Sequence, residues 1–520
     1  MNGAEVLIDT LSRGGVEVCF ANPGTSEMQL VAAIDGQDGM RSILGLFEGV
    51  VTGAADGYGR MADKPAATLL HVGSGFANGC ANLHNARRAR SPVINIVGDH
   101  ATTHLKYDAP LTSDIAGVAA PFSDWLVTST SPDDLAQKGA DAISAALEFP
   151  GQIATIIAPA DHAWDAVKHD KPKIHKSPPR PLADESGIKD AAKCLQKDGP
   201  LVLFLGATAL REDALIQAGR IAAATGARLI CETFPSRLQR GAGRVAVERL
   251  PYFGEMAADY LKDFKQVVFV GAKPPVSFFA YPNKPSWLMP EDANLVTLAT
   301  PRQCALDALT RLADALDAPE QPAHIQPEFI PPSEDGRLTP VGVGTVLAAL
   351  MPENAIVSDG AATAGLALFP MTQGAPKHDW MTLTGGAIGQ GLPLGLGAAI
   401  ACPDRKVLCL EADGSAMYTV QALWSMAREN ANVTTVILNN SSYAILNIEL
   451  ARVGVSNPGP KALAMLDLGN PSIDWVSISE GLGVPAVRAD TAQGFHAALK
   501  DALSHKGPRL VEAIIPVPGQ

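Results

Sequence analysis

Short apolar runs alternate with alanine-rich segments of helical periodicity along most of the 520 residues. The runs are four to six residues long, the length of buried strands, and lie at residues 92–97, 201–205, 267–270, 406–410 and 433–438. Such alternation of strands and helices predicts parallel sheets covered by helices on both faces. We therefore expect an α/β protein built from doubly wound parallel sheets.

Two polar, proline-rich stretches interrupt this pattern, at His169–Pro181 and at about Ala318–Pro340. Their charge and proline content are typical of linkers that cross a surface. A chain of this length exceeds what one hydrophobic core usually serves. The sequence therefore predicts three domains, at residues 1–168, 182–320 and 338–520.

Composition narrows the possible partners. The formal net charge of −13 argues against nucleic acid or an anionic membrane as the main partner. The seven cysteines are scattered and form no C-x-x-C pair, which favours free thiols in a reducing cytoplasm. The N-terminal segment lacks the pattern of a signal peptide, and no apolar run reaches the length of a membrane span. We expect a cytoplasmic protein.

Residues 406–449 carry the most informative polar motif. A strand leads into Ala412-Asp413-Gly414-Ser415, a helix is expected next, and a second strand ends at Asn439-Asn440. The apolar face expected for that helix comprises Met417, Val420, Leu423, Trp424 and Ala427. Polar groups then follow two strands at their carboxyl ends, where parallel sheets bind ligands.

The residue types in this motif suit a magnesium ion and a phosphate. The Asp413 carboxylate, the Asn440 side-chain carbonyl and the Ser442 backbone carbonyl supply the hard oxygen ligands that Mg²⁺ prefers. Gly414 lets the backbone approach a phosphate, and the following helix offers free N–H groups. An ordinary tight turn would explain either half of the motif alone.

The two halves together resemble the cofactor motif of the thiamine-diphosphate enzymes, in which G-D-G precedes N-N by some 25 residues. Here 24 residues separate Gly414 from Asn439, and Ala412 replaces the first glycine. The resemblance implies a bound thiamine diphosphate and Mg²⁺.

A second feature of this family is a glutamate that bonds the aminopyrimidine ring and promotes proton removal from the thiazolium carbon. In the family it ends a strand and precedes a small-residue helix that ends G-Y-A-R. In this sequence Glu48 follows the apolar stretch 43–47 and precedes a small-residue segment that ends Gly57-Tyr58-Gly59-Arg60. The resemblance therefore assigns the activating role to Glu48.

Residues 384–397, TGGAIGQGLPLGLG, resemble the family's glycine-rich segment. By that resemblance Ile388 props the bent cofactor and the Gly386 carbonyl accepts from its amino group. The loop at Asp359, Gly360 and Ala361 lies where the family cradles the diphosphate. The remaining cofactor-binding residues expected around the metal motif are Gly414, Ser415, Tyr443, Ala444 and Ile445.

The resemblance covers essentially the whole chain, in the order pyrimidine-binding, middle and diphosphate-binding domain. Family members place the cofactor between the pyrimidine domain of one subunit and the diphosphate domain of another. A homo-oligomer is therefore expected, at least a dimer and commonly a tetramer.

Other residues point to a branch of the family. Asn22-Pro23-Gly24-Thr25-Ser26-Glu27 is similar to the N-P-G-S-N-E of the benzoylformate decarboxylases, so Thr25 matches a substrate-contacting serine. His71 matches an active-site histidine of that branch, and Leu111 with Thr112 matches its pocket lining. Acetolactate synthases carry a glutamine at the position of Leu111.

The sequence also departs from that branch. Residues 276–281, VSFFAY, replace the stretch that holds the decarboxylase's second histidine, and Asn447 makes the pocket more polar. The other residues expected to shape the substrate pocket are Ile445, Leu446 and Glu449. The middle domain lacks the G-M-H-G stretch that accompanies flavin in acetolactate synthases, so no FAD is expected.

The sequence thus favours non-oxidative decarboxylation of a small 2-oxo acid, with carboligation as a possible outcome. The catalytic subunit of an acetolactate synthase is one alternative. A degenerate member that binds the cofactor without turnover is another, against which the retained Glu48 argues.

Overall fold

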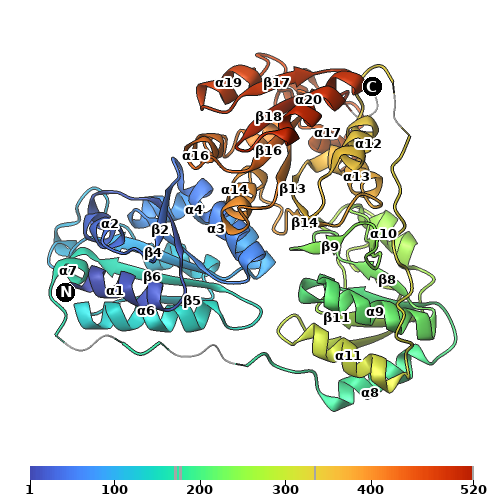
Figure 1. Ribbon diagram of the computed structural model, residues 1–520, viewed down its shortest axis with the longest axis horizontal. Coiled ribbons are helices and arrows are strands. Elements are labelled where there is room, and N and C mark those ends of the chain that lie inside the picture. Colours follow the sequence, from blue (N-terminus) through green and yellow to red (C-terminus); the bar gives the residue numbers. More distant parts are fainter. Residues whose placement is uncertain (169–171, 175–178, 333–334, 518–520) are drawn as a thin grey trace.

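In the computed structural model, which describes residues 1–168, 172–174, 179–332 and 335–517, the chain forms three α/β units around three sheets (Figure 1). Among the described strands, every pairing is parallel except that of β9 with β14. The apolar runs in the sequence form β4, β7, β11, β15 and β16, and helices cover the sheets. The predicted fold class, three doubly wound parallel-sheet domains, is confirmed.

The N-terminal unit has a six-stranded sheet in the order β2-β1-β3-β4-β6-β5. Its strands are β1 (Val18–Asn22), β2 (Arg41–Leu44), β3 (Ala66–Leu70), β4 (Val93–Asp99), β5 (Trp125–Thr128) and β6 (Ile153–Pro159). Its helices are α1 (Gly3–Arg13), α2 (Met28–Asp35), α3 (Glu48–Ala62), α4 (Val72–Ala89), α5 (Ile115–Ala119), α6 (Pro132–Ala146) and α7 (Ala160–Trp164), with 3₁₀ turns η1 (Thr25–Glu27), η2 (Leu105–Tyr107) and η3 (Ala120–Phe122).

The middle unit has a five-stranded sheet in the order β10-β8-β7-β11-β12. Its strands are β7 (Leu201–Leu205), β8 (Arg228–Cys231), β10 (Glu248–Arg249), β11 (Gln266–Val270) and β12 (Asn294–Ala299). Its helices are α8 (Glu185–Leu195), α9 (Glu212–Thr225), α10 (Gly254–Leu261) and α11 (Ala305–Ala315), with the 3₁₀ turn η4 (Ala207–Leu210).

The C-terminal unit has a seven-stranded sheet in the order β17-β18-β16-β15-β13-β14-β9. Its strands are β13 (Ala355–Gly360), β14 (His378–Thr382), β15 (Val407–Ala412), β16 (Val433–Asn439), β17 (Ala486–Ala489) and β18 (Arg509–Ile514), joined by β9 (Leu238–Arg240). Its helices are α12 (Pro340–Leu350), α13 (Ala362–Met371), α14 (Gly391–Ala401), α15 (Asp413–Ala416), α16 (Ala422–Arg428), α17 (Ala444–Arg452), α18 (Pro460–Ala464), α19 (Trp475–Gly481) and α20 (Ala492–Ser504).

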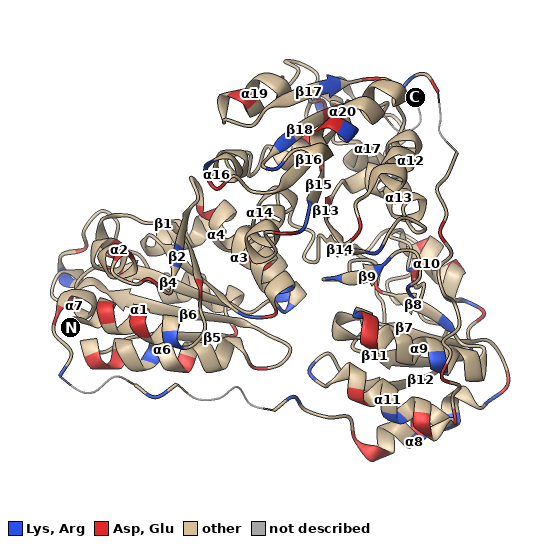
Figure 2. Ribbon diagram, in the orientation of Figure 1, with Lys and Arg blue, Asp and Glu red and all other residues tan. Residues whose placement is uncertain are grey.

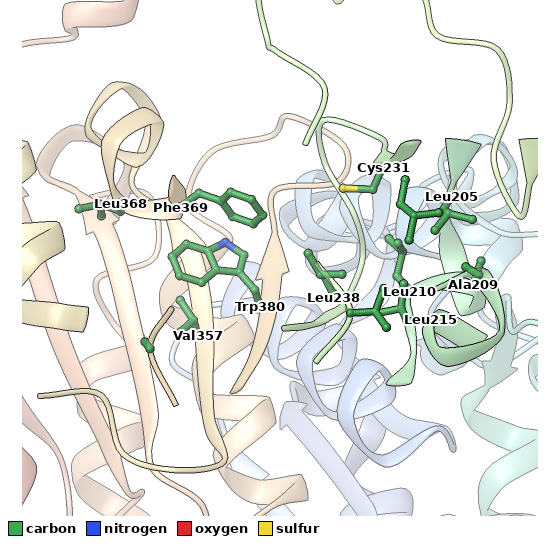
Figure 3. Packing of buried hydrophobic residues seen from close by; sticks show 14 of the residues in the cluster. Leu205, Ala209, Leu210, Leu215, Cys231, Leu238, Val357, Leu368, Phe369 and Trp380 are labelled. Atoms are coloured by element: carbon green, nitrogen blue, oxygen red, sulfur yellow. The ribbon is translucent and has the colours of Figure 1, made fainter. Parts of the chain in front are cut away.

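Strand β9 ties the middle unit to the C-terminal sheet. It comes from the middle of the chain, yet it pairs antiparallel with the edge strand β14, with Leu238 opposite Trp380. A single hydrophobic cluster runs through this junction, where Leu238, Phe369 and Trp380 lie side by side (Figure 3). The two units therefore share one core, which sequence periodicity does not reveal.

The N-terminal and C-terminal units meet where α3 packs against α14. The helices approach so closely that a Cβ on Gly57 would lie 2.0 Å from the Leu394 carbonyl oxygen, and one on Gly397 would lie 1.8 Å from that of Ala54. Larger side chains could not occupy these positions without separating the helices. The small residues after Glu48 thus serve to dock this helix.

The linker predictions fall partly outside the described residues, at 169–171, 175–178 and 333–334. Part of the second linker packs on the protein, since the Ala246 N–H donates to the His324 carbonyl and the Phe329 N–H donates to the Gly374 carbonyl. Figure 2 shows acidic and basic residues dispersed over all three units, with basic residues beside β9. Among the described helices, none has the length and apolar character needed to span a membrane.

Candidate active site

Asp413 and Asn440 lie at one edge of the C-terminal sheet because they follow the adjacent parallel strands β15 and β16. Asp413 is 2% exposed, and its oxygens accept from the Gly414 N–H at 2.9 Å and the Ser441 N–H at 2.8 Å. The Asn440 side-chain oxygen Oδ1 accepts from the Ser442 N–H at 3.0 Å. The Asp413 carboxylate thereby connects the two loops that carry the predicted metal ligands.

The surroundings of Asp413 fit a cation. Burial raises the pKa of Asp413 to about 6, and its partners among the described residues are backbone N–H groups rather than cationic side chains. Its neighbours offer amide and carbonyl oxygens, the ligand type of Mg²⁺. The described residues contain no cluster of three or more His, Cys, Asp or Glu side chains suited to a metal. A metal here would therefore rest on one carboxylate, neutral oxygens and the ligand's own phosphates.

A small pocket of about 50 Å³ adjoins this edge of the sheet. Its lining includes Asp413, Gly414, Ser415, Asn440, Ser442, Tyr443, Ala444, Ile445, Ile388 and the residues 361–364 at the start of α13. A Cβ on Gly414 would lie 2.4 Å from Tyr443 Cε1, so only glycine lets the backbone at this position pack against the Tyr443 ring. The pocket thus gathers most of the predicted cofactor-binding residues around a helix start suited to an anion.

Three of the predicted cofactor residues lie outside this lining. The Asp359 carboxylate accepts from the Ala361 N–H at 3.1 Å and from Trp380 Nε1 at 3.0 Å, so it orders the loop before α13. Gly360 packs over the buried Glu411, whose pKa burial raises to about 8. Gly386 has a φ of +76°.

The prediction of one continuous helix after Gly414 is wrong. α15 ends at Ala416 and α16 begins at Ala422, and Met417, expected on the buried face, is 40% exposed. The cause is a contact with the glycine-rich segment, because Thr419 Oγ1 donates to the Gly389 carbonyl at 2.7 Å while its N–H donates to the Ala416 carbonyl in a tighter turn. The break holds the glycine-rich segment against the metal loop.

Glu48 begins α3 in the N-terminal unit and is only 6% exposed. Its Oε2 accepts from Asn78 Nδ2 at 2.9 Å, and a Cβ on Gly75 would lie 3.0 Å from its Oε1. Among the described side chains, Asn78 is the one bonded to Glu48. Sequence reasoning missed Asn78, although a polar residue on the glycine-rich helix after His71 was a signal.

His71 forms a compact polar group with Glu27 and Ser26. His71 Nδ1 lies 2.8 Å from Glu27 Oε2 and 3.3 Å from Ser26 Oγ, and Ser26 Oγ donates to Glu27 Oε1 at 2.6 Å. Glu27 is fully buried and also accepts from the Gly24 N–H at 2.7 Å. Thr25, the predicted substrate contact, is exposed, and the neighbouring Ser26 is the residue bonded to His71. Ser26 and Glu27 end the same N-P-G motif and were not predicted as site residues.

Three residues next to predicted site residues have a strained backbone. Val72, next to His71, has a φ of +42°, Ala362 at the small pocket has +48°, and Ser441 in the metal loop has +53°. Non-glycine residues adopt this region at a cost of about 1–3 kcal/mol and cluster at functional sites. All three lie beside predicted site residues.

The predicted substrate-pocket residues are spread over two units. Leu111 is 47% exposed and Leu446 is 44% exposed, so their apolar side chains remain open to a ligand or a partner. Thr112 Oγ1 and Glu449 Oε1 are buried without a hydrogen-bond partner among the described residues. Glu449 Oε2 accepts from Arg452 Nε at 3.2 Å.

Among the described residues, the small pocket contains one half of the predicted site and none of the other. The lining of the small pocket comes entirely from residues 361–445, whereas Glu48, His71 and Thr25 belong to the N-terminal unit.

Comparison with known proteins gives matches along the whole chain. Residues 1–118 match the family described as thiamine pyrophosphate enzyme, N-terminal TPP binding domain, and residues 360–513 match the corresponding C-terminal TPP binding domain. The "Putative acetolactate synthase large subunit IlvX" of Mycobacterium tuberculosis is 52% identical over 99% of both chains. A benzoylformate decarboxylase of Pseudomonas aeruginosa is 27% identical over 97% of both.

The fold has close counterparts among solved structures. A thiamine diphosphate-dependent 4-hydroxybenzoylformate decarboxylase of Rhodococcus jostii superposes over 100% of both chains with a TM-score of 0.87 at 24% identity.

Proposed function

Because the chain belongs to the thiamine pyrophosphate enzymes, we propose that it uses thiamine diphosphate and Mg²⁺ to decarboxylate a small 2-oxo acid without oxidation. When bound, the cofactor supplies a nucleophilic carbon and a ring that accepts the electrons left by departing carbon dioxide. The chain's own residues then have to bind the cofactor, move protons and hold the substrate.

We assign the diphosphate end of the cofactor to the small pocket. Asp413, Asn440 and the Ser442 carbonyl would hold Mg²⁺, and the N–H groups at the start of α13 would face the phosphates. The buried Asp413, whose charge lacks a protein cation, supports this assignment.

Glu48 is proposed to hold a proton at Oε1. Asn78 occupies Oε2 and fixes the direction of the carboxyl group, while Oε1 lies beside Gly75, where no side chain obstructs a ligand. A carboxyl group held this way can exchange a proton with a bound ring nitrogen.

The choice of decarboxylation to an aldehyde rests on one observation, the hydrogen-bonded group of His71, Glu27 and Ser26. A buried carboxylate 2.8 Å from Nδ1 favours an imidazole that carries a proton on that nitrogen and orients its other nitrogen outward. Such a histidine can deliver a proton to a product, which favours release of an aldehyde over attack on a second carbonyl. No flavin is required for this chemistry.

Assembly of the site is proposed to need two copies of the chain. The small pocket holds no residue of the N-terminal unit among its described lining, and Glu48 lies on that unit. The exposed Leu46, Leu111, Met417 and Tyr418 beside the two half-sites suit burial against a second copy, in a dimer or tetramer.

A second candidate, the catalytic subunit of an acetolactate synthase, is favoured by the 52% identical relative that bears this name. In that reaction the same site would release carbon dioxide from one 2-oxo acid and join the remaining fragment to the keto carbon of a second. A member that binds the cofactor without turnover is the third possibility, and Glu48 with its Asn78 partner argues against it.

The test is purified protein with cofactor, Mg²⁺ and a panel of 2-oxo acids that runs from pyruvate to aromatic members. Carbon dioxide release and an aldehyde product, without flavin, are expected. Acetolactate as the dominant product or an absolute need for flavin would promote the second candidate. No carbon dioxide from any substrate, with cofactor bound, would promote the third.

The domain limits 1–168, 182–320 and 338–520 are part of this proposal, as pyrimidine-binding, middle and diphosphate-binding domains. A cytoplasmic location is proposed as well, and the seven free thiols support it.

A further inference from the structure

A second and larger cavity, of about 330 Å³, lies where the middle unit meets the C-terminal unit. One wall comes from the segment between Leu238 and Tyr252, and the other comes from Gly365, Leu366, Phe369 and Pro370 of α13. None of its lining residues lines the small cofactor pocket. The proposed reaction therefore leaves this cavity unexplained.

Two arginines line the cavity with too little negative charge to balance them. The Arg240 and Arg249 guanidinium carbons lie 3.7 Å and 4.9 Å from the centre of the Phe369 ring. Arg249 Nη1 is 3.8 Å from Asp359 Oδ2, the one carboxylate that forms an ion pair with either arginine among the described residues, while Glu248 in the lining pairs with Arg228. One guanidinium charge in this group therefore has no counter-charge.

Arg240 is the more unusual of the two arginines because it is 7% exposed. Its Nη2 donates to the Phe369 carbonyl at 2.7 Å, but Nη1 is buried without a hydrogen-bond partner among the described residues. Burial, and then the charge of Arg249, lowers the pKa of Arg240 to about 9. A buried, incompletely bonded cation beside a like charge is costly unless an anion joins it.

The rest of the cavity wall is mainly apolar. Leu238, Val245, Val247, Leu250 and Leu366 face it together with the Phe369 ring, and Gln326 and Gln373 add neutral polar groups. Such a lining fits a small molecule with one anionic group and a short apolar body. An inorganic anion would satisfy the arginines and leave this wall without a partner.

We propose that this cavity is a binding site for a monocarboxylate with an apolar body, whose carboxylate pairs with Arg240 and Arg249.

The two arginines also connect the cavity to the proposed cofactor site through α13. Arg249 faces Asp359, which accepts from the Ala361 N–H just before α13, and Arg240 holds the Phe369 carbonyl near the helix end. Residues 362–364 of the same helix line the cofactor pocket. A carboxylate bound by both arginines fixes both ends of α13, so anion and cofactor should each bind more tightly when the other is present. This coupling, unlike the anion site itself, rests on the proposed function.

The binding test is isothermal titration calorimetry with 4-methylpentanoate as the probe, with and without cofactor and Mg²⁺. One probe per chain is expected, and 4-methylpentanamide, which lacks the charge, should bind at least tenfold more weakly. Inorganic phosphate that binds as tightly as the carboxylate would overturn the apolar part of the proposal. Absence of carboxylate binding at millimolar concentration would overturn the site.

Variants locate the probe. Arg249→Gln should weaken probe binding at least tenfold, and Leu366→Trp should do so by filling the cavity without removing a charge. Arg220→Gln is the matched control, because Arg220 donates to the carbonyls of Ala318 and Pro319 outside the cavity. Arg240→Gln is a further test if circular dichroism shows that it folds.

The Glu48→Gln variant distinguishes binding in this cavity from binding in the proposed active site. It should leave the affinity for the probe unchanged. Binding lost in Glu48→Gln but retained in Arg249→Gln and Leu366→Trp would overturn the proposal. For the coupling, cofactor affinity measured by fluorescence quenching should rise about fivefold or more with saturating probe. Unchanged cofactor affinity would overturn the coupling and leave the anion site standing.

Discussion

Substitution of Glu27 by glutamine should slow the reaction while preserving the fold. Glu27 is fully buried, and its Oε2 accepts from both His71 Nδ1 and the Gly24 N–H, while its Oε1 accepts from Ser26 Oγ. A glutamine can keep its oxygen at the first position and place its NH₂ group at the second, where the Ser26 hydroxyl can rotate to accept. The substitution thus removes the charge and keeps the contacts.

The expected size follows from the difference between charged and neutral hydrogen bonds. Bonds to a charged group contribute about 1.5–3 kcal/mol and neutral bonds about 0.5–1.5 kcal/mol. The protonated His71 should therefore lose about 1–2 kcal/mol of stabilisation. If His71 delivers the product proton, kcat falls roughly 5- to 30-fold.

The assay is steady-state kinetics on the best substrate of the 2-oxo acid panel, together with thermal unfolding and cofactor affinity. We expect kcat to fall while KM, cofactor affinity and hydrogen exchange at the cofactor's reactive carbon stay within about twofold. Glu480→Gln is the matched control, because Glu480 is exposed on α19 and lies outside the hydrogen-bonded group. Wild-type kcat in Glu27→Gln, in a variant that folds, would refute the role given to this pair.

Three other predictions concern the metal loop, the activating acid and pH. Asp413→Ala or Asn440→Ala should abolish cofactor binding measured by fluorescence quenching with and without Mg²⁺, because a hard ligand is lost; unchanged affinity in both would contradict the metal assignment. Glu48→Gln should slow hydrogen–deuterium exchange at the cofactor's reactive carbon by about 10²–10⁴-fold without unfolding the protein, and exchange at the wild-type rate would exclude that role. Burial raises the pKa of Glu232 from 4.5 to about 7, so the folded state holds this proton more tightly and stability should fall as pH rises from 4.5 through 7. The loss is at most about 3 kcal/mol, the free energy that corresponds to this pKa difference, and denaturant unfolding should show a flatter pH dependence in Glu232→Gln.

Local patterns in the sequence were enough for the strands, the fold class and the family. Buried parallel strands are continuous apolar runs, and ligand groups at their carboxyl ends occupy fixed positions after each run, so Asp413 and Asn440 stood out by position, whereas Glu48 was assigned by the family resemblance. The resemblance then supplied the cofactor that these positions suggest.

Tertiary structure decided which side chains touch. Ser26, rather than Thr25, bonds His71, because the turn at Thr25–Glu27 directs Ser26 and Glu27 toward His71 and leaves Thr25 exposed, which the residue types do not specify. Other features depend likewise on contacts between segments that are far apart in the chain. These are the burial of Glu27, the bond between Glu48 and Asn78, and the break between α15 and α16.

The contact of Arg240 and Arg249 with the Phe369 ring depends on the contacts that are most distant in the sequence. Phe369 lies more than a hundred positions from either arginine in the sequence, and the three residues meet only because β9 leaves the middle unit to pair with β14. Sequence by itself determined which elements form and where ligand groups follow them, because hydrophobic periodicity and turn chemistry are local. The docking of units decided which charges are buried together, because that depends on the packing of whole sheets and helices against one another.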